Sequence, residues 1–419
     1  MSPNPALGVL YHWLGGLASG SFYVPYRGVK SWSWETYWLV GGFFSWIIAP
    51  WTMASLLTNR LTAVLGAAHG STLFWCYFFG LLWGVGGLTF GLTMRYLGLS
   101  LGMAIVMGLC AAFGTLMPPI FNGTFVHQVL GTTPGRIILF GIAVCLLGIA
   151  IAGLAGIFKE RNLSGPLKQS AIQEFDLKKG FLVAVISGVM SSCFAYGLAA
   201  GDPIKALTVR AGTPPLWQGL PVLVIVLIGG FTTNFIWTVY LNFRNKSGHE
   251  YLASELPLDV IRGNDPPQPI EETALTGPTA GILIHSPAMS MRQTIRIPLL
   301  ANYLLCAVAG ITWYLQFFFY SMGETKMGAY TFSSWTLHMA SIVIFSTLWG
   351  VGLKEWKGAG RIAVSLLIVG LLVLLSSTVI IGYGNYLNAR GSQVIENKMI
   401  TTVQRQLLAQ RRVETGWAA

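Results

Sequence analysis

The chain contains 419 residues, of which 53% are hydrophobic and only 10% are charged, and its mean hydropathy is +0.61. Soluble domains carry roughly 25% charged residues, so this composition excludes an ordinary water-soluble globular protein and predicts an integral membrane protein. The net charge of +11 would fit a nucleic-acid partner. The basic residues form no stripe with interleaved aromatic residues, however, so we expect a lipid bilayer around the chain and no nucleic-acid binding.

Ten stretches are long and apolar enough to cross a bilayer, which takes about 20 mainly apolar residues. They lie at residues 6–26, 36–57, 72–94, 98–121, 136–158, 180–201, 217–241, 298–322, 330–353 and 361–384. The predicted fold is an all-α integral membrane protein with ten transmembrane helices. The five cysteines all lie inside these stretches without a disulfide or metal-ligand spacing, so we expect them to be small core residues.

Polar segments separate or follow these stretches. Residues 242–297 contain six prolines, which predicts a long, poorly ordered connection. A polar tail covers residues 385–419, with an amphipathic helix expected around Val394–Val413. Lysine and arginine gather in the odd-numbered connections, including the linker 159–179, so the positive-inside rule predicts that these connections are cytoplasmic and both termini lie outside. The basic residues of the tail favour the opposite orientation, with the C-terminus in the cytoplasm. The tail lies beyond the last span, however, so we give it less weight than the connections between spans.

The ten stretches divide into two halves of five, residues 1–158 and residues 180–384, joined by the linker. A short internal match supports this division: "GLASGSFYVPY" (16–26) aligns with "GVMSSCFAYGL" (188–198), with Gly, Ser and Phe in register. Because five spans per half force opposite orientations, the sequence predicts an inverted five-plus-five repeat. Secondary transporters have this architecture, with the substrate site near the bilayer midplane.

Polar residues follow one helical face in three of the predicted spans. The faces comprise Asn302, Ala309, Trp313, Gln316 and Tyr320 in the eighth span, His12, Gly16, Ser19, Tyr23 and Tyr26 in the first, and Ser334, His338 and Ser341 in the ninth. A single Ser or Tyr in a span usually bonds a neighbouring helix. Three aligned faces, two of them with a histidine, instead favour a water-accessible cavity, because ionisable groups at membrane depth are costly.

The side chains on these faces predict a neutral, polyhydroxylated ligand. Trp and Tyr offer flat faces to the C–H side of a sugar ring, and Gln and Asn both donate and accept hydrogen bonds, as neighbouring hydroxyls require. An anionic substrate would need a mid-span Arg or Lys, and a large cation would need a buried carboxylate, which these spans lack. The candidate sugar-binding residues are Trp313, Gln316, Tyr320, Asn302, Tyr23 and Ser334.

Proton coupling has three candidate residues. His12 and His338 are the deep groups able to titrate near neutral pH, since an unperturbed imidazole has a pKa of about 6.5. They lie at comparable depth from the same face, so we expect them to share a cavity. The alternative is that each is a neutral histidine hydrogen-bonded between helices. Glu35 is the reserve candidate, although Arg27 and Lys30 nearby favour a plain ion pair instead.

Motifs of catalysis are missing from the sequence. It contains no His-Glu-x-x-His, nucleophile elbow or Walker A loop, so we predict no catalytic residues, no metal site and no cofactor. A membrane-embedded enzyme using the two histidines, or a sugar sensor, is the alternative outside transport. The sequence gives no prediction of oligomeric state.

Seven ordered motifs resemble the L-rhamnose–proton symporter family of the drug/metabolite transporter superfamily. They are "WSWET" (32–36), "GLTMRYLG" (91–98), "GTLMPPI" (114–120), "FDLKKG" (175–180), "WYLQFFFY" (313–320), "LHM" (337–339) and "LKEW" (353–356). The resemblance covers nearly all of residues 6–384. The connection 242–297 is longer than the family leads us to expect, and the tail after residue 384 is additional.

This resemblance implies ten helices in an inverted repeat in a bacterial inner membrane. In such a membrane, the outside location that the basic residues predict for both termini is the periplasm. It also implies that the protein imports a 6-deoxyhexose, with L-rhamnose as first choice, in symport with protons. A symporter or facilitator for another neutral monosaccharide is the alternative within transport.

Overall fold

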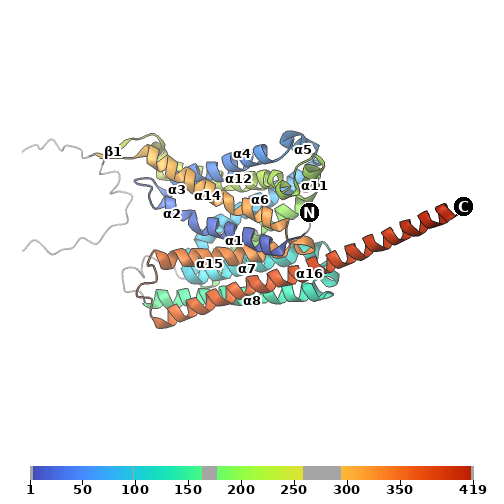
Figure 1. The fold of residues 1–419 in the computed structure, drawn as a ribbon. Coiled ribbons are helices and arrows are strands. Elements are labelled where there is room, and N and C mark those ends of the chain that lie inside the picture. The colour runs from blue at the N-terminus through green and yellow to red at the C-terminus, as the bar shows by residue number, and fades with distance from the viewer. Residues whose placement is uncertain (1–2, 98, 163–176, 258–293, 417–419) are drawn as a thin grey trace, which may run out of the picture.

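The computed structural model describes residues 3–97, 99–162, 177–257 and 294–416, which form a bundle of long helices (Figure 1). The first part of the chain contains α1 (Pro5–Ser21), α2 (Tyr23–Tyr26), α3 (Trp34–Gly42), η1 (Phe43–Ile48), α4 (Ala49–Leu57), α5 (Leu61–Ala67), α6 (Gly70–Leu97), α7 (Leu99–Phe121), η2 (Phe125–Leu130) and α8 (Thr133–Asn162). The second part contains α10 (Leu177–Ala200), α11 (Asp202–Arg210), η3 (Pro215–Trp217), α12 (Leu220–Asn245), η4 (Ser247–Tyr251), β1 (Glu255–Pro257), β2 (Thr294–Arg296), α14 (Leu299–Glu324), η5 (Gly328–Tyr330), α15 (Ser333–Gly352) and α16 (Arg361–Gly416).

Nine helices within the described residues are long and apolar enough to cross a membrane, and they correspond to nine of the ten predicted stretches. The remaining stretch, 6–26, forms α1 and α2. With 17 residues, α1 extends about 26 Å, slightly less than the roughly 30 Å of a hydrocarbon core. Phe22 keeps right-handed helical angles between the two helices, with φ −64° and ψ −25°. The all-α, multi-pass membrane architecture is confirmed, and the tenth span stays a prediction.

The predicted disorder of residues 242–297 is wrong at both ends of that segment. Helix α12 continues to Asn245, η4 follows it, and β1 pairs with β2 in an antiparallel two-stranded sheet. Hydrogen bonds between the two strands therefore tie the ends of the segment together. Residues 258–293 lie outside the described part of the chain.

The predicted boundaries of the linker 159–179 and of the tail 385–419 lie inside helices. Helix α8 runs to Asn162 and α10 begins at Leu177, so the rest of the linker, residues 163–176, lies outside the described residues. Helix α16 continues from the last span without a break to Gly416, and the helix predicted around Val394–Val413 is part of it. Figure 1 shows this helix leaving the bundle at the end where α1 begins.

Packing between helices follows a regular pattern. Helix α1 packs against α14 and α15, and α10 packs against α6 and α7. Helix α12 lies against α6, α3 with η1 lies against α14, and α8 lies along α16 on one side of the bundle (Figure 1). Small residues permit the closest approaches: a Cβ at Gly16 of α1 would lie 2.2 Å from Ser341 Oγ of α15. Glycine is the one residue that allows this spacing.

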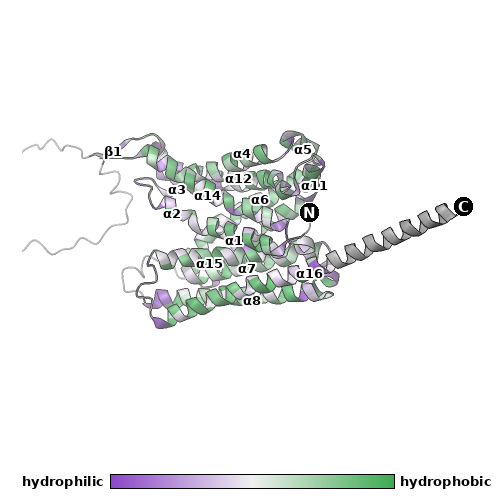
Figure 2. Ribbon diagram, in the orientation of Figure 1, coloured by the Kyte–Doolittle hydropathy of each residue, from purple (hydrophilic) through white to green (hydrophobic). Residues whose placement is uncertain are grey.

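The outer faces of the helices carry large apolar side chains. Leu56, Phe121, Phe140, Ile236 and Val379 are each more than 60% exposed, and Figure 2 shows hydrophobic residues along the helices with hydrophilic ones nearer their ends. Such surfaces are stable in lipid and would aggregate in water. All five cysteines are buried free thiols, as predicted.

The bundle has two ends that the site description needs. The terminus end carries the start of α1 and the end of α14, where the Asn4 N–H donates to the Lys326 carbonyl at 3.1 Å. The loop end carries α2, η4 and the β1–β2 sheet, and lies at the opposite side of the bundle (Figure 1).

Candidate functional site

The predicted polar face of α14 points into the protein interior. Gln316 and Tyr320 are each only 4% exposed, and Trp313 is half-buried. Residues at this spacing lie above one another along a helix, so the three side chains form a row that leads from the middle of the bundle toward the terminus end.

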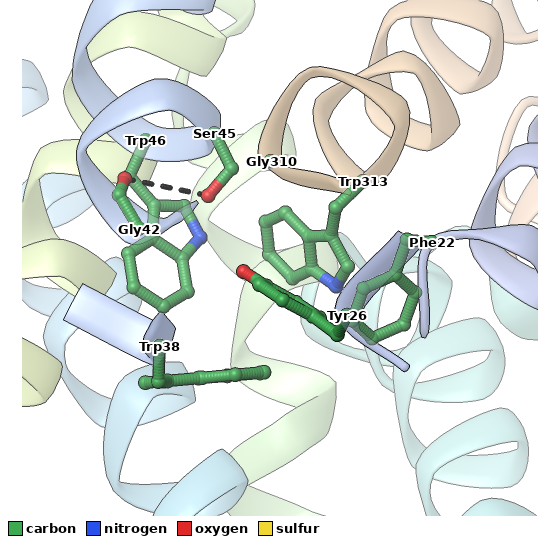
Figure 3. Close-up of a pocket in the computed structure, with 8 residues that line it drawn as sticks. All are labelled: Phe22, Tyr26, Trp38, Gly42, Ser45, Trp46, Gly310 and Trp313. Carbon is green, nitrogen blue, oxygen red and sulfur yellow. Dashed lines mark hydrogen bonds between the residues drawn. The ribbon is translucent and has the colours of Figure 1, made fainter. Parts of the chain in front are cut away.

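A pocket lies at Trp313, on the side of this row toward the loop end. It encloses about 200 Å³ of empty space, including its open mouth. Five aromatic rings and three small residues line it: Phe22, Tyr26, Trp38, Trp46, Trp313, Gly42, Ser45 and Gly310 (Figure 3). None of these eight residues is charged. Such a pocket suits a neutral ligand with an apolar face.

The short helix η1 shapes one wall of the pocket. It is a π-helix of six residues inserted between α3 and α4, and π-helical turns occur often at functional sites. Its Ser45 Oγ donates to the Gly42 carbonyl at 3.3 Å. Trp46 is 3% exposed, and its indole nitrogen has no hydrogen-bond partner among the described residues. Figure 3 shows that nitrogen on the side of the ring that faces Tyr26 and Trp313. The wall therefore offers an N–H donor and a hydroxyl.

Aromatic rings fill the space between the pocket and the terminus end. Trp83 of α6 stacks on Trp313 with ring centroids 5.6 Å apart, and Phe194 of α10 stacks on Phe317 at 4.1 Å. Phe317 also lies 6.3 Å from the ring of His338. Helices from both halves of the chain thus contribute to one apolar partition beside the pocket.

The two candidate histidines meet on the far side of this partition. The ring of Tyr320 lies 5.3 Å from the imidazole of His12 and 5.3 Å from that of His338. Both histidines are fully buried, and none of their four ring nitrogens has a hydrogen-bond partner among the described residues. The structure therefore packs both imidazoles against one tyrosine ring, without the interhelical hydrogen bonds of the alternative interpretation, and the predicted water-accessible cavity stays a prediction.

The remaining polar residue of this region, Ser334, lies one helical turn before His338 on α15. Its side chain is fully buried, and its Oγ has no partner within the described part of the chain. Ser341, one turn beyond, donates to the carbonyl of His12 at 2.9 Å and to that of His338 at 2.7 Å. Ser341 therefore fixes α1 against α15, while the Ser334 hydroxyl is unengaged.

Glu35 lies at the loop end, away from the histidines. It occupies the first turn of α3, and its Oε1 accepts from Asn245 Nδ2 at 2.9 Å and from Ser247 Oγ at 2.8 Å. The ion pair favoured by the sequence is wrong, because Arg27 pairs with Glu355 instead. Hydrogen bonds, rather than a cation, hold this carboxylate.

Of the six sugar-binding candidates only Trp313 lines the pocket. Gln316, Tyr320 and Ser334 lie toward the histidines, and the other two lie toward the loop end. Asn302 is fully buried, and its amide clamps the backbone of Lys30, donating to the carbonyl at 2.8 Å and accepting from the N–H at 3.1 Å. Tyr23 is 51% exposed and packs against Phe22 and Trp38, which line the pocket. Asn302 supports the connection after α2, and Tyr23 packs behind the pocket wall.

Comparison with known proteins decides the family. The sequence profile described as L-rhamnose-proton symport protein (RhaT) matches residues 1–249 and 287–386. The chain belongs to this family. Proteins of Salmonella paratyphi A, Salmonella paratyphi B and Salmonella typhimurium, each named L-rhamnose-proton symporter, are similar to it. Each is 36% identical over 387 residues, which cover 92% of this chain and 99% of the relative.

Membership of the L-rhamnose-proton symport protein family bears on two of the sequence expectations. The profile leaves residues 250–286 and 387–419 unmatched, which are part of the connection and most of the tail. The family consists of transporters, which decides against the membrane-embedded enzyme.

In this member of the family, several residues of the site escaped prediction from sequence. Trp38, Ser45 and Trp46 line the pocket and, with Gly42, recur at helical spacing in the second span. They were not predicted because a face made of Trp, Gly and a single Ser looks like an ordinary packed face of a helix. Lys205 and Glu324 form an ion pair at the terminus end, and their positions near predicted span ends gave no reason to connect them.

Proposed function

We propose that this protein imports L-rhamnose in symport with protons across the bacterial inner membrane. The full-length match to proteins named L-rhamnose-proton symporter carries the proposal. The site supports it, because one face of α14 places an uncharged aromatic pocket and a pair of buried histidines in sequence along the bundle.

We further propose an inverted repeat of residues 1–158 and 180–384. The packing supports it, because exchanging the spans of the two halves reproduces the main contacts between helices. Helix α1 contacts α14 and α15 as α10 contacts α6 and α7, and α3 with η1 contacts α14 as α12 contacts α6. Helices α8 and α16, the fifth spans of the two halves, contact each other. An inverted repeat of this kind places the substrate between the halves.

The sugar site in this proposal is the pocket at Trp313. An indole face packs against the C–H groups of a pyranose ring, and the N–H of Trp46 and the hydroxyls of Ser45 and Tyr26 supply donors and acceptors for the sugar hydroxyls. Gln316 lies one turn further along α14, and its side chain is buried. It extends the polar surface toward the histidines.

The proton site in this proposal is the pair His12 and His338, with Tyr320 and Ser334 beside it. A neutral imidazole that gains a proton becomes a double donor, and the unpartnered hydroxyl of Ser334 is able to accept from it. Two imidazolium ions this close would repel each other, so the pair takes up one proton at a time. The aromatic partition keeps that proton from the sugar.

We propose that the terminus end faces the periplasm, as the distribution of basic residues indicates. Protons then reach the histidines before the sugar pocket. A single cysteine at Asn122, exposed at the terminus end, should react with an impermeant maleimide in intact cells, and one at Lys357 of the loop end should not. The opposite labelling pattern would reverse the orientation.

Counterflow in proteoliposomes tests the proposed function. Purified protein should exchange labelled L-rhamnose across the membrane, and a proton gradient imposed from outside should drive its accumulation until a protonophore abolishes it. Labelled L-mannose, L-fucose and D-glucose serve as competitors. Accumulation that persists with the protonophore would indicate a facilitator or another driving ion, and stronger exchange of a competitor would indicate another neutral monosaccharide.

A further inference from the structure

Two carboxylates hold the ammonium group of Lys205 at the terminus end. Its Nζ lies 3.0 Å and 3.2 Å from the two carboxylate oxygens of Glu324 and 3.0 Å from Oδ1 of Asp202. The side chain of Lys205 is 10% exposed and that of Glu324 is 17% exposed, whereas that of Asp202 is 68% exposed. The ion pair thus joins α11 to the end of α14 in a mostly buried position, and Asp202 supports Lys205 from the solvent side.

The turn of α14 that ends at Glu324 is the one on which His12 packs. Tyr320 begins this turn and places its ring against both imidazoles. Gly323 lies so close to His12 that a Cβ there would be 2.8 Å from its Cε1 and Nε2 atoms. Glu324 is the next residue. The Glu324 carboxylate is therefore carried by the same turn of backbone that contacts the imidazole of His12.

Stability alone does not account for a buried ion pair at this place. Replacing such a pair by apolar residues of similar volume is often neutral or stabilising, because removing two charges from water is costly. Ionisable groups at membrane depth usually serve function. The pair at Lys205 lies between the proton site and the solution, at the end of the helix that also carries the pocket residue Trp313.

We propose that Lys205 and Glu324 are positioning residues for the proton step. Their ion pair holds the turn Tyr320–Glu324 against the two imidazoles, and the pair separates when His12 gains a proton. An imidazolium at His12 competes with the Lys205 ammonium for the Glu324 carboxylate. The proton comes from water at the terminus end and binds an imidazole nitrogen, with no other bond made or broken. This inference rests on the proposed proton symport.

Groups around the pair come from each element packed near it. They are Asp202 on α11, Cys76 on α6, His12 on α1, Tyr320 on α14, His338 on α15 and Lys326 after α14. Asp202 remains bound to Lys205 when Glu324 is drawn toward His12. The ammonium is therefore never left without a carboxylate, and the end of α14 is free to move while α11 stays in place.

Substitutions of the two partners should shift the pH profile of uptake in opposite directions. Glu324→Gln removes the carboxylate that stabilises an imidazolium, so gradient-driven L-rhamnose uptake should reach half-maximum at lower pH. Lys205→Met frees the carboxylate for His12, so half-maximum should move to higher pH. Each should lower the accumulation ratio by about tenfold, a typical coupling effect. Purified variants in proteoliposomes are measured from about pH 5 to pH 8, the range of imidazole titration.

Two variants serve as controls. Lys205→Arg keeps the charge and should restore the wild-type profile. Glu355→Gln breaks the ion pair with Arg27 at the loop end, where the side chains are 42% and 54% exposed, and should change nothing. Shifts in the same direction, or profiles equal to that of Glu355→Gln, would overturn the inference.

L-rhamnose counterflow and thermal unfolding distinguish a failure of this inference from a failure of the proposed function and from a failure of a variant to fold. Both variants should keep counterflow, which needs no net proton movement. Wild-type protein without counterflow would refute the proposed function itself. If Lys205→Met does not fold, Asp202→Asn at an exposed position replaces it: Lys205 then binds Glu324 alone, and the profile should shift to lower pH. An unshifted profile there would also overturn the inference.

Discussion

The pocket at Trp313 and the histidine pair at Tyr320 lie on the same face of α14 but differ in their surroundings. The pocket is an open hollow lined by a half-buried Trp313 and other rings, whereas both histidines are without exposure. One region is an uncharged hollow with an indole N–H and hydroxyl groups in its wall. The other holds two titratable groups in close packing, where a bound proton places a positive charge among buried side chains at a high cost in free energy.

This difference indicates how sugar and proton are coupled. Trp313 and Tyr320 are seven residues apart, or about 10 Å along the helix, and the rings of Phe194 and Phe317 lie between the two regions. A sugar in the pocket therefore makes no contact with the imidazoles. Coupling must act through a conformational equilibrium that both ligands bias, and α14 is the element that both of them touch.

The largest effect is expected at the histidines. His12→Gln and His338→Gln replace a titratable ring by a neutral amide, so each variant should keep L-rhamnose counterflow and lose accumulation driven by a proton gradient. Because the coupling free energy is removed, the accumulation ratio should fall to about one. Gradient-driven uptake and counterflow in the same proteoliposomes measure this.

His69→Gln is the matched control, because this histidine is exposed before α6 and its ring bonds Ser71, two residues along the chain. It should accumulate sugar like the wild type. If both buried-histidine variants still concentrate L-rhamnose with an unshifted pH profile, the histidines are structural. The two regions of α14 then do not divide sugar binding from proton binding.

An intermediate effect is expected in the pocket. Trp313→Ala removes a stacking face and should raise the half-saturation concentration for L-rhamnose by about tenfold, which corresponds to about 1.4 kcal/mol. Trp46→Phe removes an N–H and keeps the ring, so it should cost less, about 0.5–1.5 kcal/mol. The accumulation ratio at saturating sugar should stay unchanged in both.

Counterflow at graded sugar concentrations measures these values, and Trp237→Leu, on an exposed face of α12, is the control. Wild-type affinity in both pocket variants would place the sugar elsewhere. A loss of accumulation at saturation would contradict the separation of the two regions.

The sequence predicted more of the helices than of the site. Apolar length located the spans, and helical spacing showed that Trp313, Gln316 and Tyr320 share an inward face. The same spacing wrongly extended the face as one binding surface to Asn302, whose amide bonds the backbone of Lys30. From residue 302 to 320 is about 27 Å of helix, longer than a monosaccharide, so one face contains several environments that periodicity does not distinguish.

Contacts between distant segments account for the residues that were not predicted. Trp46 lines the pocket because α14 packs against η1. Lys205 and Glu324 are 119 residues apart and meet only once α11 folds beside the end of α14. Neither event leaves a periodic signal. The sequence showed that the two histidines lie at similar depth in their spans, whereas the packing of α1 against α15, which makes the two spans neighbours, is known from the structure.

The smallest effect on transport is expected at Glu35. This carboxylate lies at the loop end and accepts hydrogen bonds from Asn245 and Ser247, so it has no contact with either region of α14. Glu35→Gln keeps the shape and one acceptor oxygen, and it should leave counterflow and the accumulation ratio unchanged. Weakening bonds to a buried charge should lower the free energy of unfolding by about 1 kcal/mol.

Thermal unfolding in detergent measures the loss of stability, and gradient-driven uptake measures the accumulation ratio. Ser247→Ala is the matched variant, because it removes one of the same hydrogen bonds from the other partner and should destabilise the protein to a similar extent. If Glu35→Gln abolished accumulation while both histidine variants retained it, the proton site would lie at the loop end. The sugar pocket, rather than the histidine pair, would then be the nearer of the two regions to the proton, and coupling would pass through α3 and η1.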